Sequence, residues 1–223
     1  QTDSWEMGVV NWTNRFHEEF KKYRGYDIFP YLPVMTGRIV ESPELSNRFL
    51  QDLRRTVSDC IYENHYMLFK ELAHKHGMMI DPESGGPCYT PVDALQIMSI
   101  SDIPHGEYWA RSISHVASEG ARLSVRQSAC VAHTNGKRFV EAEGPTSIGP
   151  QWERSPKDLK GILDRIFCSG VNRLVWHAFV SSPKEYGVPG NEYFAGTHLN
   201  PNVTWWEHAG DFVDYIDRCS YLL

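Results

Sequence analysis

The feature that most constrains the fold of this chain is an alternation of helical segments with short strands that end in polar residues. Apolar residues at helical spacing predict a short helix near residues 12–23, a long helix over about 43–76, and further helices over about 118–132, from 156 onward and after 204. Strands are predicted within the strings MMIDPES, ALQIMSISD, RFVEAEGPTS and NRLVWHAF. Strands that alternate with helices along a chain favour a parallel sheet.

Two of these helices begin with recognisable capping residues. Ser155, Pro156 and Asp158 supply an N-cap serine, a proline in the first helical position and an acid in the third. The string TWWE, residues 204–207, resembles a capping box for the last helix, which we expect to reach about residue 222.

The parallel sheet leaves two architectures open, a doubly wound sheet and a barrel. A doubly wound sheet usually carries a glycine-rich phosphate loop, and the chain has no G-x-G-x-x-G string. Polar residues at the end of every strand are typical of (β/α) barrels, whose chemistry gathers at the carboxyl ends of the strands. Because only about five strands are visible, we predict an α/β fold in which residues 1–223 form one partial domain, an incomplete (β/α)8 TIM-type barrel.

Charge and hydropathy exclude several classes of partner. A net charge of −6 without a basic block argues against nucleic acid or an anionic membrane as the main partner. No apolar run approaches the roughly 20 residues of a membrane span. The five cysteines are scattered and contain no C-x-x-C pair, which argues against a zinc site or a dense disulfide framework.

Carboxylates stand at the ends of the predicted strands. On the strand FVEAEGPTS, Val140 and Ala142 share one face, whereas Glu141 and Glu143 share the other. We expect Glu143 to face a site and Glu141 to lie one layer deeper, where it needs a partner such as an arginine. The acids predicted at the same rim are Glu6, Asp81, Glu83, Glu107 and Glu143.

Several uses of these acids remain open. Carboxyls that raise one another's pKa can act as an acid and a base, as glycoside hydrolysis needs. Carboxylate oxygens also suit a hard cation such as Ca²⁺. In the plainest alternative, single glutamates after strands are exposed turn residues. Aromatic and polar side chains near the acids favour a sugar site, and the candidate substrate-binding residues are Tyr66, Trp109, His177, His198 and Asn200.

A family resemblance rests on eight strings in this order: DSWE, RGYDIFPYLP, ENHY…ELAHKHGM, ESGGP, GEYW, GKRFVEAEGPTS, VNRLVWHAF and GTHLNPNVTWW. Together they resemble the family of glycoside hydrolases numbered 106, which contains bacterial α-L-rhamnosidases. Members of that family are large multidomain proteins with a (β/α)8 catalytic barrel. The resemblance therefore implies that this chain is the middle of such a barrel, about strands 3–7, with flanking domains in the same protein.

The resemblance also implies an activity and a site. The expected reaction is inverting hydrolysis of α-L-rhamnosides in pectin or other plant glycosides, outside the cytoplasm, by a secreted, periplasmic or cell-surface enzyme that holds Ca²⁺. Catalysis is carried over to Glu6, Glu107 and Glu143, with Glu6 favoured as the acid and Glu107 or Glu143 as the base. The expected metal ligands are drawn from Glu83, Glu107 and Glu143.

Two other interpretations stay open beside this one. The first is a retaining barrel glycosidase, for example of the β-galactosidase type, whose two carboxyls would lie about 5–5.5 Å apart. The second is a carbohydrate-binding barrel without catalysis. Several unpaired acids at one rim argue against that second alternative.

Overall fold

The computed structural model describes residues 1–5, 12–83, 91–110, 119–148 and 152–223. Three parallel strands form the sheet, in the order β1 (His105–Trp109), β2 (Glu141–Thr146) and β3 (Arg173–Trp176). Two isolated parallel bridges, Thr2 with Pro82 and Glu83 with His105, extend the same arrangement on the β1 side. Five chain segments therefore run parallel, side by side and in sequence order.

This order agrees with the predicted α/β fold and its parallel pairing. The described residues form a small open sheet and do not close a barrel, so the (β/α)8 barrel and the limits of the domain stay predictions.

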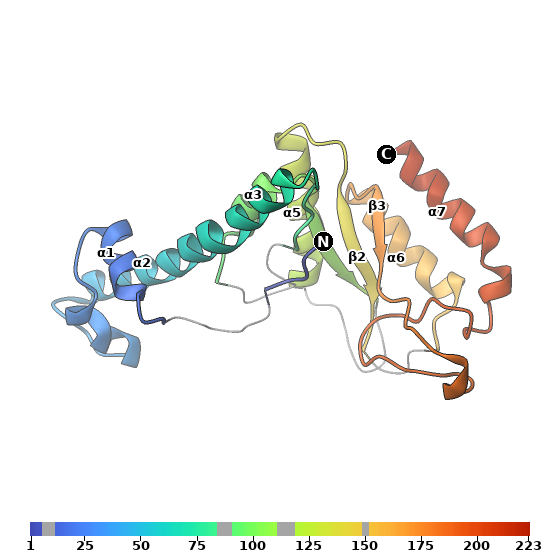
Figure 1. The fold of residues 1–223 in the computed structure, drawn as a ribbon, viewed down its shortest axis with the longest axis horizontal. Coiled ribbons are helices and arrows are strands. Elements are labelled where there is room, and N and C mark those ends of the chain that lie inside the picture. The colour runs from blue at the N-terminus through green and yellow to red at the C-terminus, as the bar shows by residue number, and fades with distance from the viewer. Residues whose placement is uncertain (6–11, 84–90, 111–118, 149–151) are drawn as a thin grey trace.

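Figure 1 shows helices on both flanks of the strands: the N-terminal helices extend to the left, and the C-terminal helices lie to the right. The helices that follow the strands are α5 (Glu119–Thr134), α6 (Pro156–Cys168) and α7 (Gly210–Leu222). The N-terminal part contains α1 (Phe16–Arg24), a 3₁₀ helix at Phe29–Thr36, α2 (Pro43–Ile61), a π-helical turn at Tyr62–Met67 and α3 (Leu68–Lys75). A short helix, α4 (Ala94–Ile100), precedes β1, and two 3₁₀ turns lie at Lys184–Tyr186 and Trp206–His208.

Two hydrophobic cores hold these layers. One lies between the sheet and α5, α6 and α7, and includes Val140, Ala142 and Leu163. The other lies among α1, α2 and the 3₁₀ helix, around Phe20 and Phe49. The face of β2 that carries Val140 and Ala142 therefore packs against the helices. The side chains of Glu141 and Glu143 project from the opposite face of the strand. None of the described helices has the length and apolarity that crossing a membrane requires.

The predicted helices are largely confirmed. The long helix over 43–76 is continuous from α2 through the π-helical turn to α3, and Asn64 in that turn donates to the carbonyl of Cys60. The capping box at Ser155 is present, with Asp158 accepting from the Ser155 backbone. The last helix begins later than predicted, because residues 206–208 form a 3₁₀ turn before α7.

Two predicted strands are corrected. ALQIMSISD forms the helix α4, because the side chain of Asp93 caps the backbone N–H of Gln96 while Ile97 and Met98 are buried. The strand lies later, at His105–Trp109. MMIDPES supplies only the bridging residues Pro82 and Glu83.

Candidate active site

The candidate site lies on the face of the sheet opposite to the one that packs against α5, α6 and α7. Glu107 on β1 and Glu143 on β2 are partners in the strand register, and the next such row toward the strand starts pairs His105 with Glu141. Side chains two residues apart on a strand share a face. Glu141 and Glu143 thus project from the same side in two successive layers, as the sequence predicts.

Three carboxylates converge in the outer layer. Asp3, Glu83 and Glu143 each place an oxygen within 4.8 Å of the other two, and we call this group the acid cluster. Asp3 is exposed, Glu143 is partly buried and Glu83 is only 2% exposed. The cluster joins three segments that are distant in sequence, because the parallel bridges bring residues 2 and 83 beside β1.

The electrostatics of the cluster centre on Glu83. Burial, and then the charges of Glu143, Glu107 and Asp3, raise the pKa of Glu83 to about 10. In the absence of a cation, Glu83 therefore holds a proton at neutral pH. Within the described part of the chain, Glu83 Oε1 is also a buried oxygen without a hydrogen-bond partner. A buried acceptor of this kind, beside two further carboxylates, suits a hard cation.

Glu107 is buried beside this cluster. Its backbone N–H donates to Ser124 Oγ of α5, which fixes the strand against that helix. Among the described residues Glu107 is not a member of the acid cluster, but its charge acts on Glu83. Trp109 lies two residues further along β1, at the strand end and beyond an irregularity in the pairing with β2, and is partly exposed.

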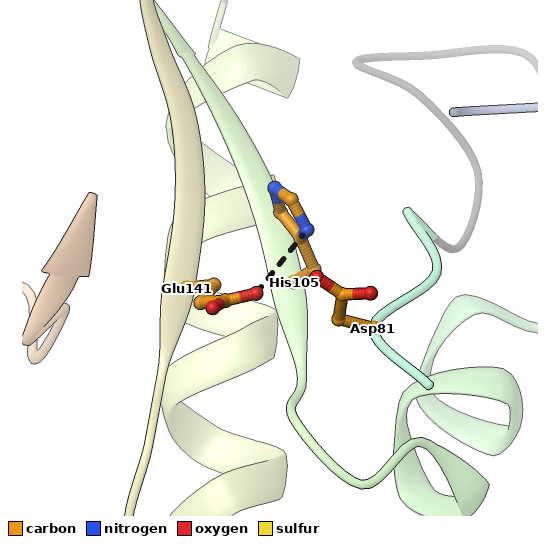
Figure 2. Close-up of side chains that lie close together, drawn as sticks. All are labelled: Asp81, His105 and Glu141. Atoms are coloured by element: carbon orange, nitrogen blue, oxygen red, sulfur yellow. Dashed lines mark ion pairs between the residues drawn. The ribbon is translucent and has the colours of Figure 1, made fainter. Parts of the chain in front are cut away.

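A second row of side chains lies directly beneath the acid cluster. Figure 2 shows His105 between Asp81 and Glu141, with a distance of 3.7 Å from His105 Nδ1 to Glu141 Oε2. Arg173 Nε lies 2.7 Å from Glu141 Oε1 and forms an ion pair with it. Arg173 is therefore the arginine partner that a buried Glu141 is expected to need. Burial lowers the pKa of His105 to about 4, so the ring is neutral. Burial and the neighbouring Asp81 raise the pKa of Glu141 to about 7, although Arg173 opposes this effect.

Two predicted substrate-binding residues contact the acids. His177 Nδ1 lies 3.6 Å from Glu143 Oε1 and 2.9 Å from Thr146 Oγ1, and the ring is partly exposed. The hydroxyl of Tyr66 donates to the backbone carbonyl of Glu83 at 3.4 Å, and the side chain is buried. His177 is therefore placed to orient Glu143, and Tyr66 to position Glu83.

The other two predicted sugar contacts are buried in the loop before α7. The amide of Asn200 donates to the carbonyl of Val180 and accepts from the backbone N–H of Asn202. His198 Nε2 accepts from the N–H of Tyr193, and its ring packs edge-on against Trp152. These contacts favour a role in shaping the loop, and direct sugar binding by His198 or Asn200 stays a prediction.

Glu6, the favoured acid, lies outside the described residues. The structure adds two residues that the sequence analysis does not single out, Asp3 and His105. Each stands close to a predicted residue, Asp3 within DSWE and His105 two positions before Glu107. A search for polar residues on the same strand face as Glu107 would have found His105.

The spacing of the acid cluster limits what it can do. An inverting glycosidase separates its acid and base by about 6.5–9.5 Å to leave room for water. The oxygens of Asp3, Glu83 and Glu143 lie within 4.8 Å of one another, which is too close for that arrangement. The cluster is instead suited to holding a cation or a shared proton beside one catalytic carboxylate.

Comparison with known proteins gives one family and two close relatives. The family model described as alpha-L-rhamnosidase matches residues 1–223. The rhamnosidase from Novosphingobium sp. PP1Y is a solved structure that is 36% identical, with a TM-score of 0.83 over 98% of this chain and 21% of that one. A protein from Formosa agariphila named "Putative beta-glucuronidase" is 37% identical over 221 residues. The match covers 99% of this chain but 18% of that relative, so the chain spans about a fifth of the length of each protein.

Proposed function

This chain belongs to the alpha-L-rhamnosidase family of glycoside hydrolases, and on that basis we propose that the protein cleaves terminal α-L-rhamnosyl residues from plant polysaccharides or glycosides with inversion. The proposal is supported by one observation above the others. Carboxylates from separate segments meet at one rim of the parallel sheet, beside His177 and next to the strand end that carries Trp109. Carboxylates and aromatic rings are the groups with which glycosidases act on sugars.

Charge favours a neutral sugar over a glucuronide. A glucuronide carries a carboxylate, which the charges of Asp3, Glu107 and Glu143 would repel. Arg173, the arginine of the described site, already pairs with Glu141. Because one relative is named for a glucuronide activity, β-glucuronide hydrolysis is nevertheless the second candidate function.

In the proposed mechanism, Glu143 is the base and Glu6 is the acid. Glu143 takes a proton from water as the water oxygen bonds to the anomeric carbon, while Glu6 donates its proton to the departing glycosidic oxygen. Glu143 is preferred to Glu107 because Glu143 is partly exposed and contacts His177, whereas the Glu107 side chain is buried. Glu107 would then help to set the charge around Glu83.

The acid cluster also fits calcium. Its donors are carboxylate oxygens, and the buried Glu83 Oε1 lacks a hydrogen-bond partner. Asp3 and Glu83 would hold the ion beside Glu143, and Glu107, whose charge acts on Glu83, is a further candidate ligand. When bound, the ion would offset two of the negative charges and could coordinate sugar hydroxyls. Because carboxyls must lose their protons to bind a metal ion, affinity should rise with pH.

The first test compares substrates with the complete protein that contains this chain. We expect kcat/KM for an aryl α-L-rhamnoside to exceed that for an aryl β-D-glucuronide by at least about 100-fold. Proton NMR of the first product should show β-L-rhamnose, as inversion requires. Initial release of the α-anomer would instead support a retaining enzyme. A higher kcat/KM for the glucuronide would contradict the rhamnosidase proposal and support β-glucuronide hydrolysis, the second candidate function.

Removal of calcium provides the next test. We expect EDTA to lower turnover at least about 10-fold, because the uncompensated acids take up protons and lose their geometry. Ca²⁺ should restore activity and raise the melting temperature. Mg²⁺ is the control, since it demands short octahedral coordination and keeps its waters. Full activity and an unchanged melting temperature in EDTA would count against the calcium site.

The remaining alternative is a carbohydrate-binding module without catalytic activity, and a complete protein that hydrolyses no glycoside would support it.

Plant polysaccharides are too large to enter a cell intact. We therefore propose a secreted, periplasmic or cell-surface location and contact with flanking domains of the same protein.

A further inference from the structure

A single row of side chains crosses the sheet and meets the acid cluster at Glu83. Glu83 bridges to His105, His105 is the register partner of Glu141, and Glu141 is the register partner of Arg173. Four separate segments thus place an acid, a histidine, an acid and an arginine side by side. Parallel strands align such rows across a sheet, so the order of the row follows from the register alone.

We propose that His105 is a positioning residue, which links the carboxyl of Glu83 to the Glu141–Arg173 ion pair and so fixes the acid cluster for catalysis. The inference rests on the proposed function, because it assigns a role within that same site. His105 does not reach the sugar in this role. It acts through Glu83, which in turn contacts Glu143.

The contacts of the imidazole support this role. Nε2 lies 3.5 Å from Glu83 Oε1, and Nδ1 lies 3.7 Å from Glu141 Oε2. The side chain is fully buried, and neither nitrogen has a hydrogen-bond partner at normal distance among the residues that the structure describes. Burying a polar ring without hydrogen bonds is costly, so an apolar residue would be favoured if the position only filled space. A shift of less than 1 Å would let the ring bond both carboxyls.

The hydrogen-bonding groups of the imidazole indicate how the ring is oriented between Glu83 and Glu141. A neutral imidazole offers one N–H and one lone pair. Arg173 contacts Glu141 and favours its ionised form, so the ring N–H is directed at Glu141 from Nδ1, and Nε2 is the nitrogen that faces Glu83. The ion pair would thereby set the ring tautomer.

The ion pair between Arg173 and Glu141 is the anchor at the β3 end of the row. The Arg173 side chain is 51% exposed, whereas that of Glu141 is 2% exposed. Arg173 can therefore be changed with less risk to folding than the buried members of the row.

A metal ion held by Asp81, His105 and Glu141 is the competing interpretation, because their ligand atoms lie within 4.8 Å of one another. One of the two acidic charges is already offset, however, because Arg173 pairs with Glu141. A further dication would leave this buried group with excess positive charge.

A double-mutant cycle on the complete protein tests the proposal. His105→Gln and Glu83→Gln are each expected to lower kcat on the aryl α-L-rhamnoside by about 10- to 100-fold, the range seen when a supporting side chain is removed. The double variant should resemble Glu83→Gln alone, because His105 acts only through Glu83. The KM of His105→Gln should stay within about 3-fold of the unmutated value. Independent effects that multiply in the double variant would overturn the proposal.

Two further variants control for folding. His74→Gln removes a histidine–carboxylate contact of 2.8 Å with Asp102, outside the site, and should leave kcat unchanged. Arg173→Gln loosens the anchor while keeping the buried residues, and should lower kcat severalfold. If His105→Gln fails to fold, an unchanged kcat in Arg173→Gln would refute the role of the row.

Failure of the proposed function is separable from failure of this inference. If the unmutated protein hydrolyses no rhamnoside, the function fails, and the melting temperatures of the four proteins in the cycle still measure the link. Melting-temperature shifts that are non-additive support contact between His105 and Glu83, whereas additive shifts exclude it. Stoichiometric Zn²⁺ or Mn²⁺ in the purified protein, lost in His105→Gln, would establish the metal site instead.

Discussion

Replacement of Glu143 by glutamine should lower kcat on an aryl α-L-rhamnoside by about 10²- to 10⁴-fold, the usual contribution of a positioned base. Glutamine keeps the shape of the side chain but cannot accept the proton of water at neutral pH. Because Glu143 is partly exposed and lies among other acids, removing its charge relieves repulsion rather than breaking the fold. The melting temperature should stay within about 2 °C of the unmutated value or rise slightly.

The leaving group distinguishes the base from the acid. A substrate with an activated aryl leaving group needs little help from an acid, so Glu6→Gln should lose much less activity on it than on an alkyl rhamnoside. Glu143→Gln should be equally impaired on both, because attack by water is needed in each case. Glu71→Gln, an exposed position on α3, serves as the control. Turnover of Glu143→Gln within severalfold of normal would reassign Glu143 to a structural role.

Local signals in the sequence predict much of this fold. Helical spacing and capping residues locate α6 closely, and strand alternation identifies the face of β2 that carries Glu141 and Glu143. The need of a buried Glu141 for an arginine follows from burial alone. Arg173 meets that need because it is the register partner of Glu141.

The errors arise where local signals are ambiguous. A short apolar run such as ALQIMSI fits a strand or a buried helix, and only the cap at Asp93 distinguishes them. β1, in contrast, has few aliphatic residues, because one of its faces carries His105 and Glu107 while the other carries Gly106 against α5. Its composition therefore does not look like that of a strand.

Asp3, the third member of the acid cluster, is missed for a different reason. Asp3 and Glu83 are 80 positions apart in the sequence, and they meet because residue 2 bridges to residue 82. Nothing in either local sequence specifies that pairing. The sequence therefore predicts that several acids lie at one rim of the sheet. Which of these acids are close enough to share a proton or bind one cation depends on the register between distant segments.

Substitution of Gly144 by alanine should destabilise the protein strongly and abolish most activity. Gly144 has φ of +155°, and a Cβ there would lie 2.6 Å from the carbonyl oxygen of Tyr108 and 2.7 Å from two atoms of its ring. Overpacking in a filled core costs about 1–3 kcal/mol, and a strained backbone conformation costs about 1–3 kcal/mol more. We expect a loss of about 2–6 kcal/mol, measured by chemical or thermal unfolding.

The effect should reach the site because Gly144 follows Glu143 directly in β2. Relief of the clash requires β2 to move away from Tyr108, and that movement would displace Glu143 from His177 and from the acid cluster. Gly161→Ala is the matched control: an added Cβ there meets no atom within 4 Å, and the position lies inside α6. It should stabilise by about 0.5–1 kcal/mol, the cost of glycine in a helix. If Gly144→Ala retained normal stability and turnover, the close packing of β2 against Tyr108, and the placement of Glu143 that depends on it, would be wrong.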